Sequence, residues 1–94
     1  MIKHIVCFKL NEGESAQKAK EVLLSMKGNV PMLLDIEVGV DLLHSARSYD
    51  VILQVVLKDM QTLEEYQQDA YHVNVVKKHM HAVTKTSVAV DYEI

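Results

Sequence analysis

Apolar and polar residues alternate along residues 2–10 with the period of a β-strand, because successive side chains of a strand point to opposite faces. One face holds four apolar residues and one histidine: Ile2, His4, Val6, Phe8 and Leu10. The other face has lysines near its ends and Ile5 and Cys7 at its centre. The pattern predicts a strand whose first face is buried and whose second face is covered at its centre.

A helical repeat follows this strand. Ser15 is the predicted N-cap, because its side-chain oxygen can accept a hydrogen bond from a free amide of the first turn. Apolar residues then recur at helical spacing: Ala16, Ala19, Val22, Leu23 and Met26. Gly28 and Pro31 end the pattern, so a helix is expected between residues 15 and 27.

The remaining segments predict two strands, a broken helix and a last strand. Residues 36–43 alternate, whereas residues 49–57 are apolar on nearly both faces, as in a central strand. Residues 60–83 have a helical pattern that is interrupted around Gln68-Asp69, and residues 85–93 return to alternation.

The predicted order is βαββαβ, which is typical of the ferredoxin-like α+β fold, with a four-stranded antiparallel sheet and both helices on one face. Residues 1–94 form one domain, because a chain of this length has no room for a second core. The chain leaves the second sheet face uncovered. We therefore expect a homodimer whose two sheets pack face to face.

Composition narrows the classes of partner. The chain has 10 basic and 13 acidic residues, a net charge of −3, and no basic cluster. This argues against binding to nucleic acid or to an anionic membrane, and no apolar segment is long enough to span a bilayer. Cys7 is the only cysteine, and the start of the chain does not resemble a signal peptide, so a cytoplasmic location is expected. A small-molecule ligand is the expected partner besides a second copy.

Tyr66 and His72 are the strongest candidates for chemistry. They lie six positions apart, and about 600° of rotation along one straight helix would leave them on different faces. A break at Asp69 resolves this, because Asp69 can act as the N-cap of a new helix. The positive end of that helix disfavours an imidazolium, so His72 is expected to be neutral near pH 7.

These residues suggest proton-transfer catalysis. His72 would act as general base, Tyr66 would donate to a carbonyl oxygen where negative charge develops, and His4 would line the opposite wall and orient the substrate. This scheme requires no cofactor and no metal. The alternatives are an exposed, inert His72, a Tyr66 that only fills the core, and a His4 bonded to a backbone carbonyl.

Other polar residues give weaker predictions. His79 and His81 face different ways on a helix and have no third ligand at suitable spacing, so they are expected to face solvent rather than a metal ion. Lys77 and Lys78 are interpreted as a solvated helix edge.

The chain resembles the stress-responsive A/B barrel (Dabb) family along its whole length. The segments that carry the resemblance are Ile2-Lys3-His4-Ile5-Val6, Ile36-Glu37-Val38-Gly39-Val40-Asp41, Ser48-Tyr49-Asp50-Val51, Glu65-Tyr66, Tyr71-His72 and Val90-Asp91-Tyr92-Glu93. The resemblance implies a dimeric α+β barrel.

One plant branch of the family, the olivetolic acid cyclases, is similar at the site and closes a linear polyketide by an aldol condensation. By motif, its catalytic histidine and tyrosine fall on His72 and Tyr66, and its first-strand histidine falls on His4. The chain has Asp69-Ala70-Tyr71-His72 where the family usually has His-Pro-Ala-His. The bulky Tyr71 is therefore expected to shape the substrate-binding wall.

The resemblance and the residues together lead to one functional hypothesis and two alternatives. The hypothesis is a cofactor-independent cyclase or isomerase that acts on a polyketide-like or aromatic carbonyl compound. The first alternative is a non-catalytic, stress-associated binding or scaffold dimer. The second is a cofactor-independent monooxygenase of the dimeric barrel group.

Overall fold

The computed structural model describes residues 1–94 and has the predicted order of strands and helices. The strands are β1 (Ile2–Leu10), β2 (Asp35–Val40), β3 (Val51–Leu57) and β4 (Thr84–Glu93). The helical elements are α1 (Ala16–Leu24), α2 (Met60–Gln68), the π-helix η1 (His72–Lys77) and α3 (Lys78–Val83). The ferredoxin-like α+β prediction is confirmed.

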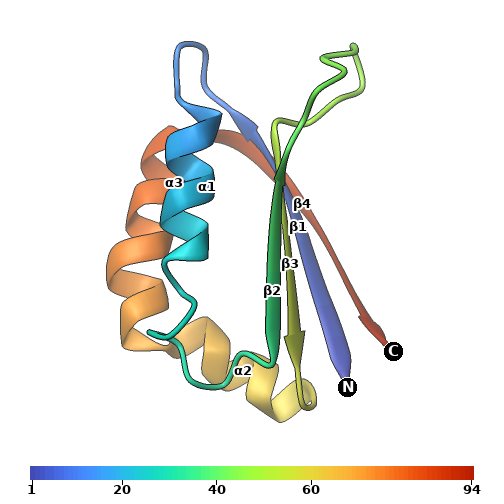
Figure 1. The fold of residues 1–94 in the computed structure, drawn as a ribbon, viewed down its shortest axis with the longest axis vertical. Coiled ribbons are helices and arrows are strands. Elements are labelled where there is room, and N and C mark those ends of the chain that lie inside the picture. Colours follow the sequence, from blue (N-terminus) through green and yellow to red (C-terminus); the bar gives the residue numbers. More distant parts are fainter.

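The four strands form one antiparallel sheet in the order β2-β3-β1-β4, so β3 and β1 are central and β4 is an edge strand. All helices lie on one side of the sheet (Figure 1). The two termini lie close together at one end of the sheet, where the amide of Ile94 donates to the carbonyl of Met1 over 2.9 Å.

The core fills the layer between the helices and the sheet. Its fully buried large side chains come from the helices, the segment after α1 and β3: Tyr66, Leu23, Met26, Leu57, Val30, Val55 and Val76. Only 18 of the 94 residues are buried, and the other sheet face contributes none of the core, as Ile5 and Cys7 are half-buried. The chain alone therefore covers one face of its sheet.

Capping residues fix where the helices begin. The Ser15 hydroxyl accepts from the amide of Lys18 over 3.0 Å, which confirms the predicted N-cap of α1. Asp59 caps α2 in the same way, with 2.8 Å between its carboxylate and the amide of Thr62.

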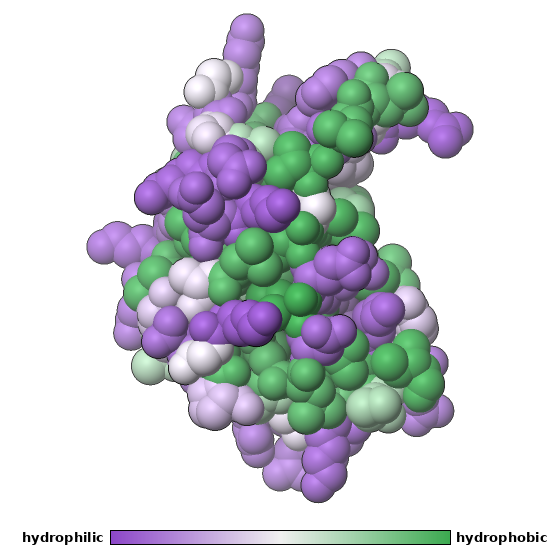
Figure 2. All heavy atoms as spheres, viewed as in Figure 1, coloured by the Kyte–Doolittle hydropathy of each residue, from purple (hydrophilic) through white to green (hydrophobic).

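The segment between β2 and β3 differs from the prediction, because both strands are shorter than the alternating pattern suggested. β2 ends at Val40 and β3 begins at Val51, since the Asp41 carboxylate accepts from the amide of His44 over 2.7 Å and turns the chain. Residues 41–50 form a loop that projects beyond the sheet, away from the helices (Figure 1). Leu42 and Leu43 on this loop are 91% and 78% exposed, and apolar atoms gather on it (Figure 2).

Candidate active site between the sheet and the helices

The helix break at Asp69 is present as predicted. The Asp69 amide donates to the carbonyl of Tyr66 over 3.2 Å, and its ψ of 134° ends α2. Its carboxylate then accepts from the amide of His72 over 3.0 Å, and its carbonyl accepts from the amide of Val73 over 2.9 Å. Asp69 thus ends one helix and caps the next turn, which brings His72 back beside Tyr66.

The second helical segment contains a π-helix, which the sequence pattern did not predict. η1 spans His72–Lys77, and its hydrogen bonds join residues five apart. Residues five apart therefore lie roughly one turn apart, so His72 and Lys77 share a side of the helix. In an α-helix the same pair would be separated by about 140° of rotation.

His72 is buried between the broken helix and the sheet, with 6% of its surface exposed. Its Nδ1 lies 2.9 Å from the carbonyl oxygen of Tyr66. Since a carbonyl can only accept, Nδ1 carries the proton in this bond and Nε2 remains free. Burial lowers the pKa of His72 below its ordinary value. The predicted neutral state is thus supported, but burial and not the helix end is its main cause.

Tyr66 lies at the centre of the site. Its ring stacks on the His72 ring, with centroids 4.2 Å apart and planes 25° apart, and it meets the edge of the His4 ring at 5.8 Å. Tyr66 has no exposed surface, and burial raises the pKa of its phenol above the ordinary value. Its hydroxyl donates to Met26 Sδ over 3.7 Å. The hydroxyl therefore lies in the core, which differs from the predicted donor position facing a substrate.

His4 faces the helices, as predicted, and is 6% exposed. Its Nδ1 pairs with the Asp91 carboxylate, because the two residues are directly opposite each other in the β1–β4 register. The carboxylate, and not a backbone carbonyl, is thus the partner of this histidine. Pairing through Nδ1 fixes the ring and leaves Nε2 free, as in carboxylate–histidine pairs of acid–base sites.

A cavity of about 240 Å³ opens beside these rings. It is lined by His4, Val6, Phe8, Leu23, Leu53, Tyr66, Gln67, His72, Val76, Lys77, Met80, His81, Ser87 and Ala89. The structure therefore brings His4, Tyr66 and His72 together at one hollow between the sheet and the helices. Apolar walls with a few convergent polar groups are typical of small-molecule sites.

Tyr71 does not reach this cavity. Its hydroxyl donates to Ser25 Oγ over 2.8 Å, and its ring packs against the core beside α1. The expected contribution of Tyr71 to a substrate-binding wall therefore has no counterpart in this geometry, because the break at Asp69 turns its side chain towards α1.

Three polar residues of the site were missed or misplaced by the sequence analysis. Asp91 becomes visible only through the pairing of the first and last strands. Lys77 is half-buried at the cavity, and not on a solvated edge, because of the π-helix. His81 is exposed, as expected, but it also lines the cavity. No three histidine, cysteine or acidic side chains converge in a way that could hold a metal ion.

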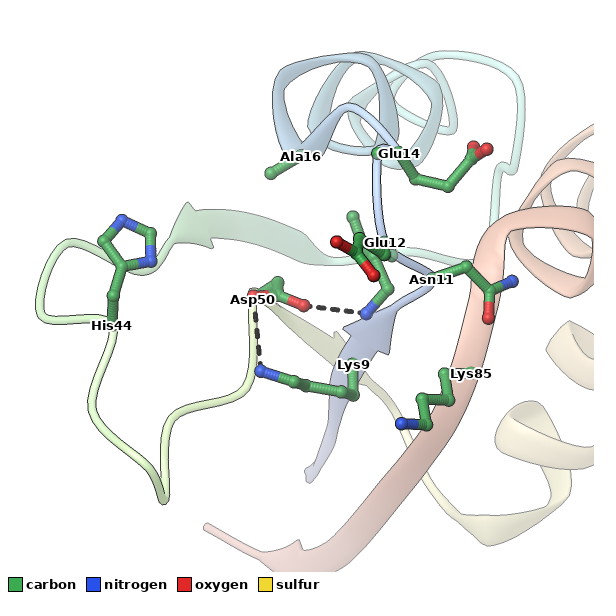
Figure 3. A pocket seen from close by; sticks show the side chains of 10 residues that line it. Lys9, Asn11, Glu12, Glu14, Ala16, His44, Asp50 and Lys85 are labelled. Atoms are coloured by element: carbon green, nitrogen blue, oxygen red, sulfur yellow. Dashed lines mark hydrogen bonds and ion pairs between the residues drawn. The ribbon is translucent and has the colours of Figure 1, made fainter.

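A second hollow, of about 480 Å³, lies near the end of β1 (Figure 3). Two of its charged groups are paired, with Lys9 Nζ 3.8 Å from Asp50 Oδ1, and Asp50 Oδ2 also accepts from the amide of Leu10 over 2.8 Å. This hollow is more open and more polar than the cavity beside His72. The side chain of His44, which lines it, is mostly exposed. This hollow lacks an enclosed reactive group, so the cavity beside His72 is the better candidate.

The fold and this cavity define a ferredoxin-like α+β domain with two buried histidines at a cavity between its sheet and its helices. The family model for the stress responsive A/B barrel domain matches residues 2–94. The chain therefore belongs to this family, Dabb. No curated protein matches the chain significantly. No helix has the length and apolar character needed to cross a membrane.

Solved structures of similar fold cover nearly the whole chain. A dimeric ferredoxin-like protein from Bacteroides fragilis is 22% identical, with a TM-score of 0.84 over 99% of this chain and 95% of its own. One from Thermobifida fusca, also described as dimeric, has the same identity and TM-score over 99% and 90%. A hydroxynitrile lyase from Passiflora edulis is 17% identical, with a TM-score of 0.77 over 99% and 92%. The more specific likeness to olivetolic acid cyclase is not shown by these comparisons and stays a prediction.

Proposed function

We propose that this chain is a cofactor-independent acid–base catalyst that acts on a small carbonyl compound, as a cyclase, isomerase or lyase. The observation that carries the proposal is the contact of two buried histidines with one buried tyrosine at a single cavity. Each histidine has its Nδ1 engaged, by the Tyr66 carbonyl or by Asp91. Each therefore keeps Nε2 for proton transfer.

His72 is the proposed general base. Its lowered pKa keeps it neutral at pH 7, so Nε2 has a lone pair that can remove a proton from the carbon beside a carbonyl. The bond from Nδ1 to the Tyr66 carbonyl sets the ring orientation and supports the charge that develops when Nε2 takes the proton.

His4 takes over the donor role that the sequence suggested for Tyr66. When His4 is an imidazolium, its Nε2–H can donate to the carbonyl oxygen while the Asp91 carboxylate balances the charge. Tyr66 then acts as a positioning residue, because its ring contacts both histidines and its hydroxyl is directed into the core.

We also infer that the working unit is a homodimer joined through the open sheet face. Three apolar residues of β4 are strongly exposed on that face: Val88, Val90 and Tyr92, at 50%, 60% and 42%. In the strand register Val90 and Val88 lie beside Ile5 and Cys7 of β1, and Tyr92 lies beside Lys3. A continuous apolar face of this kind is typical of an interface, and two structures of the same fold are described as dimeric. A cytoplasmic location stays a prediction that rests on the single cysteine.

Hydrogen–deuterium exchange at carbon tests the catalytic proposal. Phenylacetone in D₂O is followed by proton NMR with wild-type protein, His72→Gln, His4→Gln and the exposed loop variant His44→Gln. We expect wild type and His44→Gln to accelerate exchange, and His72→Gln to lose about a hundredfold or more of that acceleration.

Two results would count against the proposal. Exchange that is unchanged in His72→Gln would remove this residue as the base. A probe that shifts protein resonances at the cavity but gains no deuterium with wild type would favour the non-catalytic binding dimer. The hydroxynitrile lyase among the similar structures supports the catalytic proposal over the binding dimer, because that enzyme has the same fold.

A further inference from the structure

The charges around the cavity beside His72 differ in sign from those of the whole chain. The chain has a net charge of −3, yet none of the fourteen residues that line the cavity is acidic. One lysine and three histidines are among them: Lys77, His81, His4 and His72. The acidic groups identified beside the cavity residues already have partners: Asp91 pairs with His4, and the Asp69 carboxylate accepts from the amide of His72.

Lys77 is held in place at this cavity. Its Nζ donates to the carbonyl of Gln67 at the end of α2 over 2.9 Å, and the side chain is half-buried. An ammonium has three N–H donors, so two of them remain for a ligand. Burial is the main cause of the lowered pKa of His72, and the positive charge of Lys77 lowers this pKa further. Lys77 and the proposed base, His72, therefore line the same cavity and are close enough to interact.

The π-helix is the reason for this placement. Because η1 pairs residues five apart, His72 and Lys77 lie on one side of the helix, and Val76 lines the same cavity. In a regular α-helix the side chain of Lys77 would be rotated by about 140° from that of His72. π-turns are uncommon and are frequent at functional sites.

The rest of the lining is largely apolar and forms the apolar wall of the cavity. Its residues come from the sheet and from the helices: Val6, Phe8, Leu53, Ala89, Leu23, Val76 and Met80. A ligand that fits both Lys77 and this apolar wall has an apolar body and one anionic group. A cavity of about 240 Å³ limits that body to roughly the size of one aromatic ring with a short chain.

We propose that the cavity selects small organic acids, with Lys77 as the carboxylate-binding residue and the apolar wall as the site for an aryl or alkyl body. This inference rests on the proposed function for the position of the reacting carbonyl near His72. The binding step itself does not depend on turnover. Lys77 is a specificity residue in this scheme: it pairs with the carboxylate, and Gln67 and His81 supply further hydrogen-bonding groups at the same cavity.

Benzoylpropionate and its methyl ester test the carboxylate preference, because they differ only in the anionic group. We expect wild type to bind the acid about tenfold or more tightly than the ester by NMR titration, with the preference falling as salt is added. Lys77→Met should remove the preference and leave ester binding unchanged, since the apolar stem is kept. Lys77→Arg should retain it.

Lys78→Met is the matched control, since it removes the same charge from the neighbouring, exposed position. Its acid-to-ester preference should equal that of wild type. Circular dichroism of each variant checks that α2 and η1 remain folded after the bond to Gln67 is lost. Equal affinity of wild type for acid and ester, or the same loss in Lys78→Met as in Lys77→Met, would overturn the proposal.

The two proposals fail separately. Deuterium exchange into phenylacetone, a neutral probe, measures the acid–base chemistry without the carboxylate. Exchange without an acid preference would leave the catalytic proposal in place and remove the Lys77 inference. An acid preference without exchange into either probe would retain the organic-acid site and remove the catalyst.

Discussion

The two faces of the sheet are built from the same strands and differ in what completes them. On the helix side, the two buried histidines of the site have hydrogen-bond partners within the chain. His4 pairs with the Asp91 carboxylate, and His72 bonds to the carbonyl of Tyr66. On the open side, Val88, Val90 and Tyr92 remain exposed. The helix face is therefore covered within one chain, whereas the open face is the proposed interface with a second copy.

Two neighbouring residues of β4 make the contrast sharpest. Val90 points to the open face and Asp91 to the helix face, since adjacent side chains of a strand alternate. One residue belongs to the proposed interface and the next belongs to the proposed site. Substitutions on opposite faces should therefore have separable effects.

The largest expected effect is the loss of the central ring on the helix face. Tyr66→Ala removes a fully buried aromatic side chain and should lower the free energy of unfolding by about 3–5 kcal/mol, measured by urea denaturation. Tyr92→Ala, on the open face, is the comparison and should cost the isolated chain about 0.5 kcal/mol or less. Equal losses would mean that the two faces are equally packed within one chain.

The second effect concerns association. Val90→Asp places a charge among the exposed apolar residues of β4 on the open face and should weaken dimerisation by roughly a hundredfold or more, measured by light scattering over a dilution series. Val75→Asp is the control, because Val75 is 42% exposed and lies on η1, away from the sheet. A wild-type chain that is monomeric at micromolar concentration would refute the interface.

The third effect concerns only the site. Asp91→Asn keeps the shape of the side chain and removes the charge that pairs with His4, so the rate of deuterium exchange should fall by about tenfold or more. Glu93→Gln changes the same charge two residues further along β4 and should leave the rate unaltered. Association of Asp91→Asn should match that of wild type, because this side chain does not point to the open face.

The smallest effect is a pH dependence of stability. The pKa of His72 lies below its ordinary value of 6.5 because of burial. Between these two pKa values the unfolded chain binds more protons than the folded chain, so the free energy of unfolding falls as the pH drops below 6.5 and the contribution is constant above it. Urea denaturation across this range should show a steeper loss in wild type than in His72→Gln. Identical slopes would contradict the assignment.

The fold could be predicted from the sequence because its patterns are local. The alternation of residues 2–10, the cap at Ser15 and the break at Asp69 each depend on neighbours in the chain. The ends of β2 and β3 were predicted less well, since the turn at Asp41 overrides an alternating pattern that continues to Leu43.

The site was only partly predictable, for three physical reasons. Rotation along a helix indicated that Tyr66 and His72 need a break to meet, but not that the Tyr66 hydroxyl would turn to Met26. The pair His4–Asp91 joins residues 87 positions apart and depends on strand register. Lys77 reaches the cavity through a π-helix, which an α-helical period cannot reveal.

The place of Asp91 has a consequence for how the protein would respond to its own concentration. β4 is hydrogen-bonded to β1 alone and is exposed along almost all of its length, and such edge segments open locally at low cost. A partner packed on the open face would hold β4 in place and, with it, the carboxylate that orients His4. We therefore expect the specific activity to fall on dilution before the fold is lost. The protein would then be active only above the concentration at which it dimerises.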